Sequence, residues 1–105
     1  MPDRLEADRA QAIADAVAAL PAVAGLSGGR FGEIALLYPR RRVIGLREAD
    51  RGARLEIHVR LHVDVADPRP LQGPLDAVRD AAIRALGPDA AGRTVDVVLD
   101  DVVQA

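Results

Sequence analysis

The eleven residues LEIHVRLHVDV at 55–65 constrain the fold of this chain more than any other stretch. Apolar and polar side chains alternate along it without interruption. The apolar set is Leu55, Ile57, Val59, Leu61, Val63 and Val65, and the polar set is Glu56, His58, Arg60, His62 and Asp64. Strict alternation puts one set on each face of a β-strand, whereas a helix would scatter the apolar residues around its axis. The stretch therefore predicts a long strand, within 53–66, that has one buried and one polar face.

The same alternation decides how the two histidines of the chain are related. On a helix, His58 and His62 would form a metal-ligand pair, but on a strand residues at this spacing lie about 13 Å apart along the chain. Zinc needs ligands about 2.0–2.2 Å from one ion, so the two imidazoles could only just meet, in a nearly linear arrangement. Pairs such as Glu56–His58 or His62–Asp64 would need further ligands. We therefore predict no metal and no cofactor, and keep a metal-binding protein that uses His58 and His62 as an alternative.

Two other stretches have helical periodicity. The first runs over about 3–20, with Asp3 and Glu6 as expected caps of its start. Its expected buried stripe is Leu5, Ala12, Ile13, Ala16, Val17 and Leu20. The second follows Pro74, which suits the first helical position, and stops at Gly87. Its expected buried face is Leu75, Val78, Ala82 and Leu86, with Ile83 at the edge.

Shorter strands fill most of the remainder. They are expected at 22–27, 31–38 and 42–48, and the stretch RTVDVVLDDVV forms the last strand. Turns at Pro39–Arg41 and Ala49–Gly52 join 31–38, 42–48 and 53–66 into a β-meander. The order α-β(β)ββ-α-β predicts an α+β fold for a single domain over 1–105. It is a small two-layer sandwich, with two helices on one face of a mainly antiparallel sheet.

The glycine-rich segment AVAGLSGGRFGE at 22–33 raises the possibility of a ligand-binding loop. A phosphate-binding P-loop would end in Gly-Lys-Ser/Thr and enter a helix, but this chain has no lysine and a strand is expected next. The spacing of Gly25 and Gly28 matches the GxxG loop of KH RNA-binding domains, which lies between helices beside basic charge. The segment has neither the ending of a P-loop nor the helix-flanked, basic surroundings of a KH loop, so it predicts a turn or bulge.

Composition limits the classes of function further. The formal net charge is −2, and all fourteen basic residues are arginine. Charge is uneven, because residues 30–60 carry +4 and residues 61–105 carry −4. The basic tip Arg40, Arg41 and Arg42 suits a solvated turn, or docking on an acidic partner or an anionic lipid. No apolar run approaches the ~20 residues that span a bilayer, and no signal peptide is evident, so we expect a cytoplasmic protein without a transmembrane segment.

Few side chains in this chain can act as nucleophiles. Ser27, Thr94 and Tyr38 are the only residues of their types, and cysteine is absent. Nucleophilic catalysis needs a positioned Ser, Cys, Thr or Lys with a base beside it. We therefore predict that the chain is not an enzyme and has no small-molecule substrate.

Five segments together resemble the bacterial alkaline shock protein family of envelope stress-response proteins, in the short form found in actinobacteria. They are PAVAGLSGGRFGE, RRRVIGLRE, LEIHVRLHVDV, PL…VRDAAIRAL and VDVVLDDV, and the match as a whole runs over about 13–102. The resemblance implies a small α/β domain, an abundant cytoplasmic protein, self-assembly, and attachment to the membrane through a separate small membrane protein. It implies no catalytic residues. One departure is Ala22, where the family often has glycine after the proline.

Composition and resemblance together predict a non-catalytic protein of envelope stress response and homeostasis. It would act by self-association, as a homo-oligomer, or by docking on a membrane-associated partner, which would hold it at the periphery of the membrane. The candidate interaction face is Arg40, Arg41, Arg42, Glu56, His58, Arg60, His62 and Asp64. The alternative is a nucleic-acid-binding module, which the basic middle of the chain favours; the negative net charge and the lack of a stacking platform oppose it.

Overall fold

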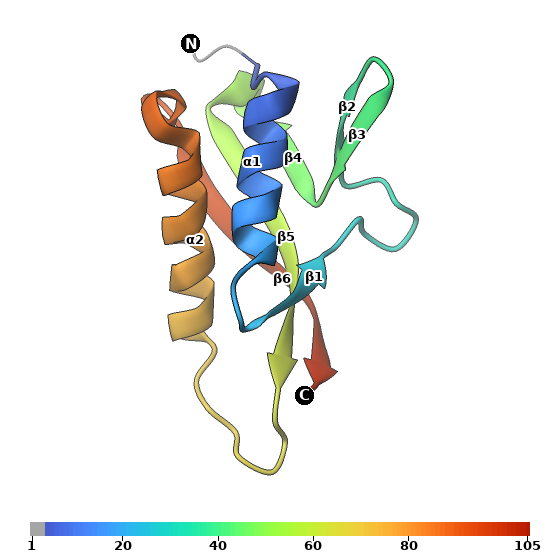
Figure 1. Cartoon of the computed structure of the whole chain (residues 1–105), viewed down its shortest axis with the longest axis vertical. Coiled ribbons are helices and arrows are strands. Elements are labelled where there is room, and N and C mark those ends of the chain that lie inside the picture. Colours follow the sequence, from blue (N-terminus) through green and yellow to red (C-terminus); the bar gives the residue numbers. More distant parts are fainter. Residues whose placement is uncertain (1–3) are drawn as a thin grey trace.

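The computed structural model describes residues 4–105. Over that range the elements are α1 (Ala7–Ala18), β1 (Val23–Leu26), β2 (Ala35–Tyr38), β3 (Arg41–Ile44), β4 (Leu46–Ala49), η1 (Asp50–Gly52), β5 (Arg54–Val63), α2 (Gln72–Leu86), η2 (Gly87–Ala90) and β6 (Thr94–Gln104). The fold is α+β, as predicted, with α1 and α2 side by side over one face of a mainly antiparallel sheet (Figure 1). In this part of the chain no helix has the length and apolar character needed to cross a membrane.

Strand β5 organises the sheet. One of its edges pairs in parallel with β6 over its whole length, from Arg54 opposite Thr94 to Val63 opposite Gln104. Its other edge is shared, because β4 pairs antiparallel with 54–57 and β1 pairs antiparallel with 59–61. Parallel strands need a long crossover connection, and α2 supplies it between β5 and β6.

The predicted long strand is confirmed over most of its length, but it ends at Val63 rather than at residue 66. Asp64 stops it, because its carboxylate accepts a hydrogen bond from the Ala66 amide at 2.9 Å and its carbonyl accepts one from Asp67 at 3.1 Å. Such side-chain and backbone bonds favour a turn over a continued strand. Val65, expected on the buried face, is consequently 76% exposed.

The core lies between the two helices and the sheet. Leu55, Ile57, Val59 and Leu61 are fully buried, as the alternation predicts. The helices contribute Ala10, Ile13, Ala14 and Val17 from α1 and Val78, Ala81, Ala82 and Leu86 from α2. The prediction was wrong for Ala12, which is exposed on α1. Helix α1 also begins at Ala7 after Glu6, which makes no side-chain capping bond; Asp3 lies outside the described residues.

The expected strand 42–48 is broken at Gly45, so the predicted continuous meander was wrong here. Gly45 has φ +91°, and a Cβ at that position would lie 2.6 Å from the Cβ of Leu26. Its amide donates to the Ile34 carbonyl at 2.9 Å, and its carbonyl accepts from the His58 amide at 2.8 Å. Strands β2 and β3 therefore form a separate hairpin, which lies on the far side of α1 from α2 and contacts α1 through β3 (Figure 1).

Candidate functional site

The polar residues of β5 lie on the sheet face opposite the helices. Glu56 and His58 are largely covered there, with 14% and 11% of their side chains exposed, whereas Arg60 and His62 are exposed. Asp64 does not belong to this face, because the strand ends one residue before it. The predicted polar face is therefore uneven, with an enclosed end near β4 and an open end near the end of β5.

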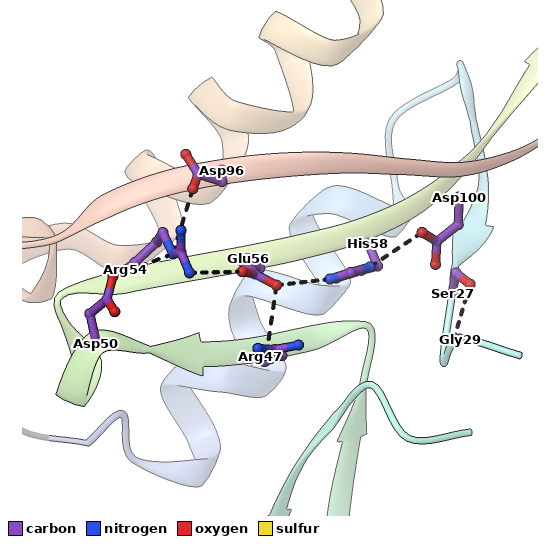
Figure 2. A network of polar contacts seen from close by, with 9 residues as sticks. All are labelled: Ser27, Gly29, Arg47, Asp50, Arg54, Glu56, His58, Asp96 and Asp100. Carbon is purple, nitrogen blue, oxygen red and sulfur yellow. Dashed lines mark hydrogen bonds and ion pairs between the residues drawn. The ribbon is translucent and has the colours of Figure 1, made fainter. Parts of the chain in front are cut away.

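An ion-pair network runs across the enclosed end (Figure 2). The Arg54 guanidinium lies 3.4 Å from the Glu56 carboxylate, 3.6 Å from that of Asp50 and 3.8 Å from that of Asp96. The Glu56 carboxylate also lies 3.8 Å from the guanidinium of Arg47 on β4. One continuous network therefore combines charges from β4, β5, β6 and the turn η1. Each contact in it joins a guanidinium to a carboxylate.

His58 continues this network toward β6. Its Nε2 lies 3.2 Å from Glu56 Oε1, and its Nδ1 lies 3.3 Å from Asp100 Oδ1 (Figure 2). Neutral imidazole donates from one ring nitrogen only, whereas imidazolium donates from both. The protonated form would satisfy both carboxylates at once, and the neutral form would leave one of them facing a lone pair.

Ser27, His58 and Asp100 line one open cavity of about 610 Å³. These are the residue types of a hydrolytic triad, so their geometry is decisive. In a triad the histidine nitrogen not bound to the aspartate must face the serine hydroxyl. Here that nitrogen faces Glu56, and Ser27 Oγ accepts a hydrogen bond from the Gly29 amide at 3.2 Å (Figure 2). The serine is thus part of a turn and is not held against a base.

The open end of the same cavity carries exposed charges. Arg60 extends over Gly25, where a Cβ would come within 3.0 Å of its guanidinium. Among residues 4–105, neither Arg60 nor Arg30 takes part in an ion pair, although Asp100, Asp101 and Glu33 line the cavity with them. Such a surface can bind charged groups of either sign without covalent chemistry.

The structure separates the two histidines. His62 and Asp64 line a different cavity of about 410 Å³, together with Pro68, Pro70 and Leu71 of the loop that follows β5. In the region described, no three or more Asp, Glu or His side chains are grouped so that they could hold a metal ion. His58 and His62 thus have different neighbours and different exposure, although they share one strand face.

The basic tip lies on the β2–β3 hairpin, away from the sheet face. Arg40 occupies the turn with φ +64°. Arg41 forms an ion pair with Asp8 of α1 at 2.6 Å, and Arg42 is exposed opposite Leu37. The candidate face predicted from sequence is therefore divided among the hairpin, the network end of the sheet and the loop after β5.

Tyr38 ties the hairpin to the segment before α1. Its hydroxyl donates to the Leu5 carbonyl at 2.8 Å, and the Arg4 guanidinium lies 4.6 Å from its ring centroid. Arg4 also donates to the Leu37 carbonyl. Burial raises the pKa of the Tyr38 phenol above its ordinary value of 10.0, against the opposing effect of Arg4. The hairpin is thus held at its base by Gly45 and at its tip by Tyr38.

Sequence reasoning missed the partners that enclose His58 and Glu56. Asp96 and Asp100 stand at polar positions of the last strand, but only the parallel register, with Glu56 opposite Asp96, brings them to the network. A β-bulge in β6 between the partners of Val59 and Arg60 places Asp100 beside His58. The alternation of apolar and polar residues in β6 indicates which face Asp96 and Asp100 occupy. No local feature of the sequence indicates the register of β6 against β5.

Comparisons with known proteins found no matching family model, no matching curated protein and no matching solved structure.

Proposed function

We propose that the chain is a non-catalytic interaction module of envelope homeostasis, which acts by self-association or by docking on a membrane-associated protein. The observation that carries the proposal is the sheet face opposite α1 and α2. It is left uncovered by the helices and holds charges at fixed positions on β4, β5 and β6. The resemblance to the alkaline shock protein family supports the envelope role.

The distribution of charge on this face favours a second copy of the chain as a partner. Strand β6 contributes the acids Asp96, Asp100 and Asp101, and strands β4 and β5 contribute the bases Arg47, Arg54 and Arg60. An isologous interface brings each patch against the partner's complementary patch twice. Two sheet faces related by a two-fold axis can therefore place the acidic strip of each copy on the basic strip of the other.

The geometry around Ser27 supports the non-catalytic part of the proposal. The hydroxyl is engaged by the Gly29 amide, and the nearest imidazole has both of its nitrogens directed at carboxylates. A nucleophile needs a base within hydrogen-bond reach. Neither side chain is free for that role in this arrangement.

Sedimentation velocity at micromolar concentration tests self-association. We expect association that increases with concentration and weakens with salt, because exposed charge pairs are screened. Arg60→Glu alone and Asp101→Arg alone should each reduce association. An equal mixture of the two variants should restore it, since opposite charges then face each other in both contacts. Arg84→Glu on α2 is the matched control and should change nothing.

A strict monomer under all these conditions would contradict self-association. The membrane-associated partner is then tested with wild-type and Arg60→Glu baits in an extract of the native host. A partner retained by the wild type and lost by the variant supports docking through this face. Identical recovery by the two baits would contradict the proposal.

A further inference from the structure

We propose that the outer face of the β2–β3 hairpin, with the adjoining turn at 28–32, binds the surface of an anionic lipid bilayer directly. This goes beyond the proposed function, because the ligand is lipid and the hairpin belongs to a separate two-stranded sheet. The inference starts from a concentration of exposed apolar side chains. Phe31 is 86% exposed, Leu37 64% and Ile44 42%, and they make up half of the large exposed hydrophobic residues in the described chain.

Strand pairing places these side chains on one side of the hairpin. Leu37 is opposite Arg42 and Ala35 is opposite Ile44, so these four residues share the outer face. Leu36 and Val43 form the next pair and are buried on the inner face. The turn at 28–32 lies beside the outer face, because a Cβ on Gly28 would lie 3.2 Å from Ile44 Cγ2. Phe31 lies within that turn and is the most exposed of the three apolar side chains.

The same surface is basic in a chain whose net charge is −2. Between residues 30 and 44 there are four arginines and one acid. The acid, Glu33, accepts a hydrogen bond from the Phe31 amide at 2.8 Å. Arg41 is paired with Asp8, while Arg30, Arg40 and Arg42 form no ion pair with any residue between 4 and 105. Arg30 also lines the open cavity beside His58. The guanidinium groups of Arg40 and Arg42 are thus the two available at the hairpin itself.

A bilayer surface matches this combination better than a nucleic acid does. Nucleic-acid surfaces stack successive bases on aromatic rings. Among residues 4–105 only one exposed ring, that of Phe31, is present here, because Leu37 and Ile44 are aliphatic and Tyr38 is engaged by Leu5 and Arg4. At a lipid interface, apolar side chains enter the boundary of the acyl chains, and arginine side chains extend to the phosphates. Phe31, Leu37 and Ile44 line neither of the two cavities described above.

The shape of the molecule permits the contact. The hairpin and the turn that precedes it lie on the same side of the view in Figure 1, on the far side of α1 from α2. Arg41 ties the inner face of the tip to Asp8 of α1, so the outer face can reach the headgroup region while the inner face stays on α1. The backbone of β2 and β3 pairs from Ala35–Ile44 to Tyr38–Arg41, which limits the unpaired polar groups that the lipid would have to accept.

Vesicle co-sedimentation of the full chain tests the proposal. One set of vesicles contains phosphatidylcholine alone and the other contains added phosphatidylglycerol. We expect binding to the anionic set only, with loss at high salt. Arg42→Ser should weaken binding about five-fold, the equivalent of ~1 kcal/mol for one basic residue near an anionic leaflet. Leu37→Ser should weaken it at least as much, because an apolar anchor is lost.

Two matched variants on α2 serve as controls. Arg84→Ser removes the same charge and Ile83→Ser removes a side chain that is as exposed as Ile44, 42% in both cases. Neither should change binding. Because the chain has no tryptophan, Phe31→Trp is a specific reporter of insertion. Its emission should shift to the blue with anionic vesicles, and that of Ile83→Trp should not.

Three results would overturn the inference. The first is no binding of the wild-type chain to anionic vesicles. The second is an equal loss with Arg42→Ser and Arg84→Ser, which would indicate an effect of total charge. The third concerns a single-stranded RNA. If the RNA displaces the wild-type chain from the vesicles, and Leu37→Ser binds the RNA as tightly as the wild type does, the surface is a nucleic-acid site.

Discussion

The sheet face and the outer face of the hairpin are both left uncovered by helices, yet they differ in how their polar groups are satisfied. On the sheet face, Glu56, His58 and Asp100 contact one another, and Arg54 joins them through Glu56. On the hairpin, Arg42 stands beside the exposed Leu37 and has no acidic partner in the described chain. On the sheet face, most of the charged groups form ion pairs within the chain. On the hairpin, an unpaired guanidinium lies next to exposed apolar side chains.

This difference indicates different binding behaviour. A partner of the sheet face must compete with ion pairs that already exist, so recognition there depends on register and on salt. A partner of the hairpin gains from burying apolar side chains and from meeting free guanidinium groups. The substitutions below test whether the sheet face and the outer face of the hairpin act independently. They are ordered from the largest expected effect to the smallest.

Gly45→Ala should have the largest effect, because Gly45 joins the two regions. A side chain at φ +91° costs about 1–2 kcal/mol, and forcing it against Leu26 adds about 1–3 kcal/mol. We expect the free energy of unfolding in urea to fall by about 2–5 kcal/mol. Gly73→Ala, with nothing within 4 Å of the new Cβ, is the control and should be neutral or slightly stabilising. Equal stability of Gly45→Ala and wild type would contradict the strained junction.

His58→Ala tests the sheet network. Removing a buried donor between Glu56 and Asp100 should cost about 1–3 kcal/mol of stability. His62→Ala is the natural comparison, since His62 is exposed on the same strand face and its side chain forms no hydrogen bond or ion pair with any residue between 4 and 105. Urea unfolding of both variants gives the difference directly. If the two substitutions cost the same, the network contributes little to stability.

Tyr38→Phe tests the attachment of the hairpin. Loss of the hydrogen bond to the Leu5 carbonyl should cost about 0.5–1.5 kcal/mol. The raised pKa of Tyr38 also predicts a pH dependence, because folding favours the neutral phenol. That contribution is complete below the ordinary pKa of 10.0 and is lost as the pH rises through the folded-state pKa. Absorbance titration of this single tyrosine should give a midpoint above that of the unfolded chain; an unshifted midpoint would contradict the burial.

Arg40→Gly should have the smallest effect on stability and the opposite sign. Arg40 has φ +64° after Pro39, a turn position that favours glycine. Relief of that conformation should add about 0.5–1 kcal/mol to the free energy of unfolding. The same change removes a free cation, so binding to anionic vesicles should fall by about five-fold. A variant that is more stable and binds vesicles as well as wild type would argue against a role of Arg40 in docking.

Much of the fold followed from local pattern. Alternation over 55–63 predicted β5 and its buried set, and periodicity predicted α2 with its stop at Gly87. The break at Gly45 was not predicted, because RVIGLRE was interpreted as one strand over 42–48. Only the close approach of Leu26, distant in sequence, shows why glycine stands there. The position of the strand end after Val63 depended in the same way on hydrogen bonds that the pattern did not reveal.

The candidate site was only partly predictable. Its residues on β5 were correctly expected to lie on one polar face, but the burial of His58 is caused by neighbours from β6 and from the segment before β2. Register between distant strands is set by the whole packed core and is not visible in either strand alone. The exposed apolar face of the hairpin was missed because Leu37 and Ile44 look like core residues by type.

The side chain of His58 belongs to the charged network, and its backbone joins two further segments of the chain. Its amide is bonded to the Gly45 carbonyl at 2.8 Å, and its carbonyl accepts from the Ser27 amide at 2.8 Å, at the point where β5 changes partner from β4 to β1. Gly45 at the base of the hairpin and the imidazole between Glu56 and Asp100 are therefore separated by a single backbone hydrogen bond.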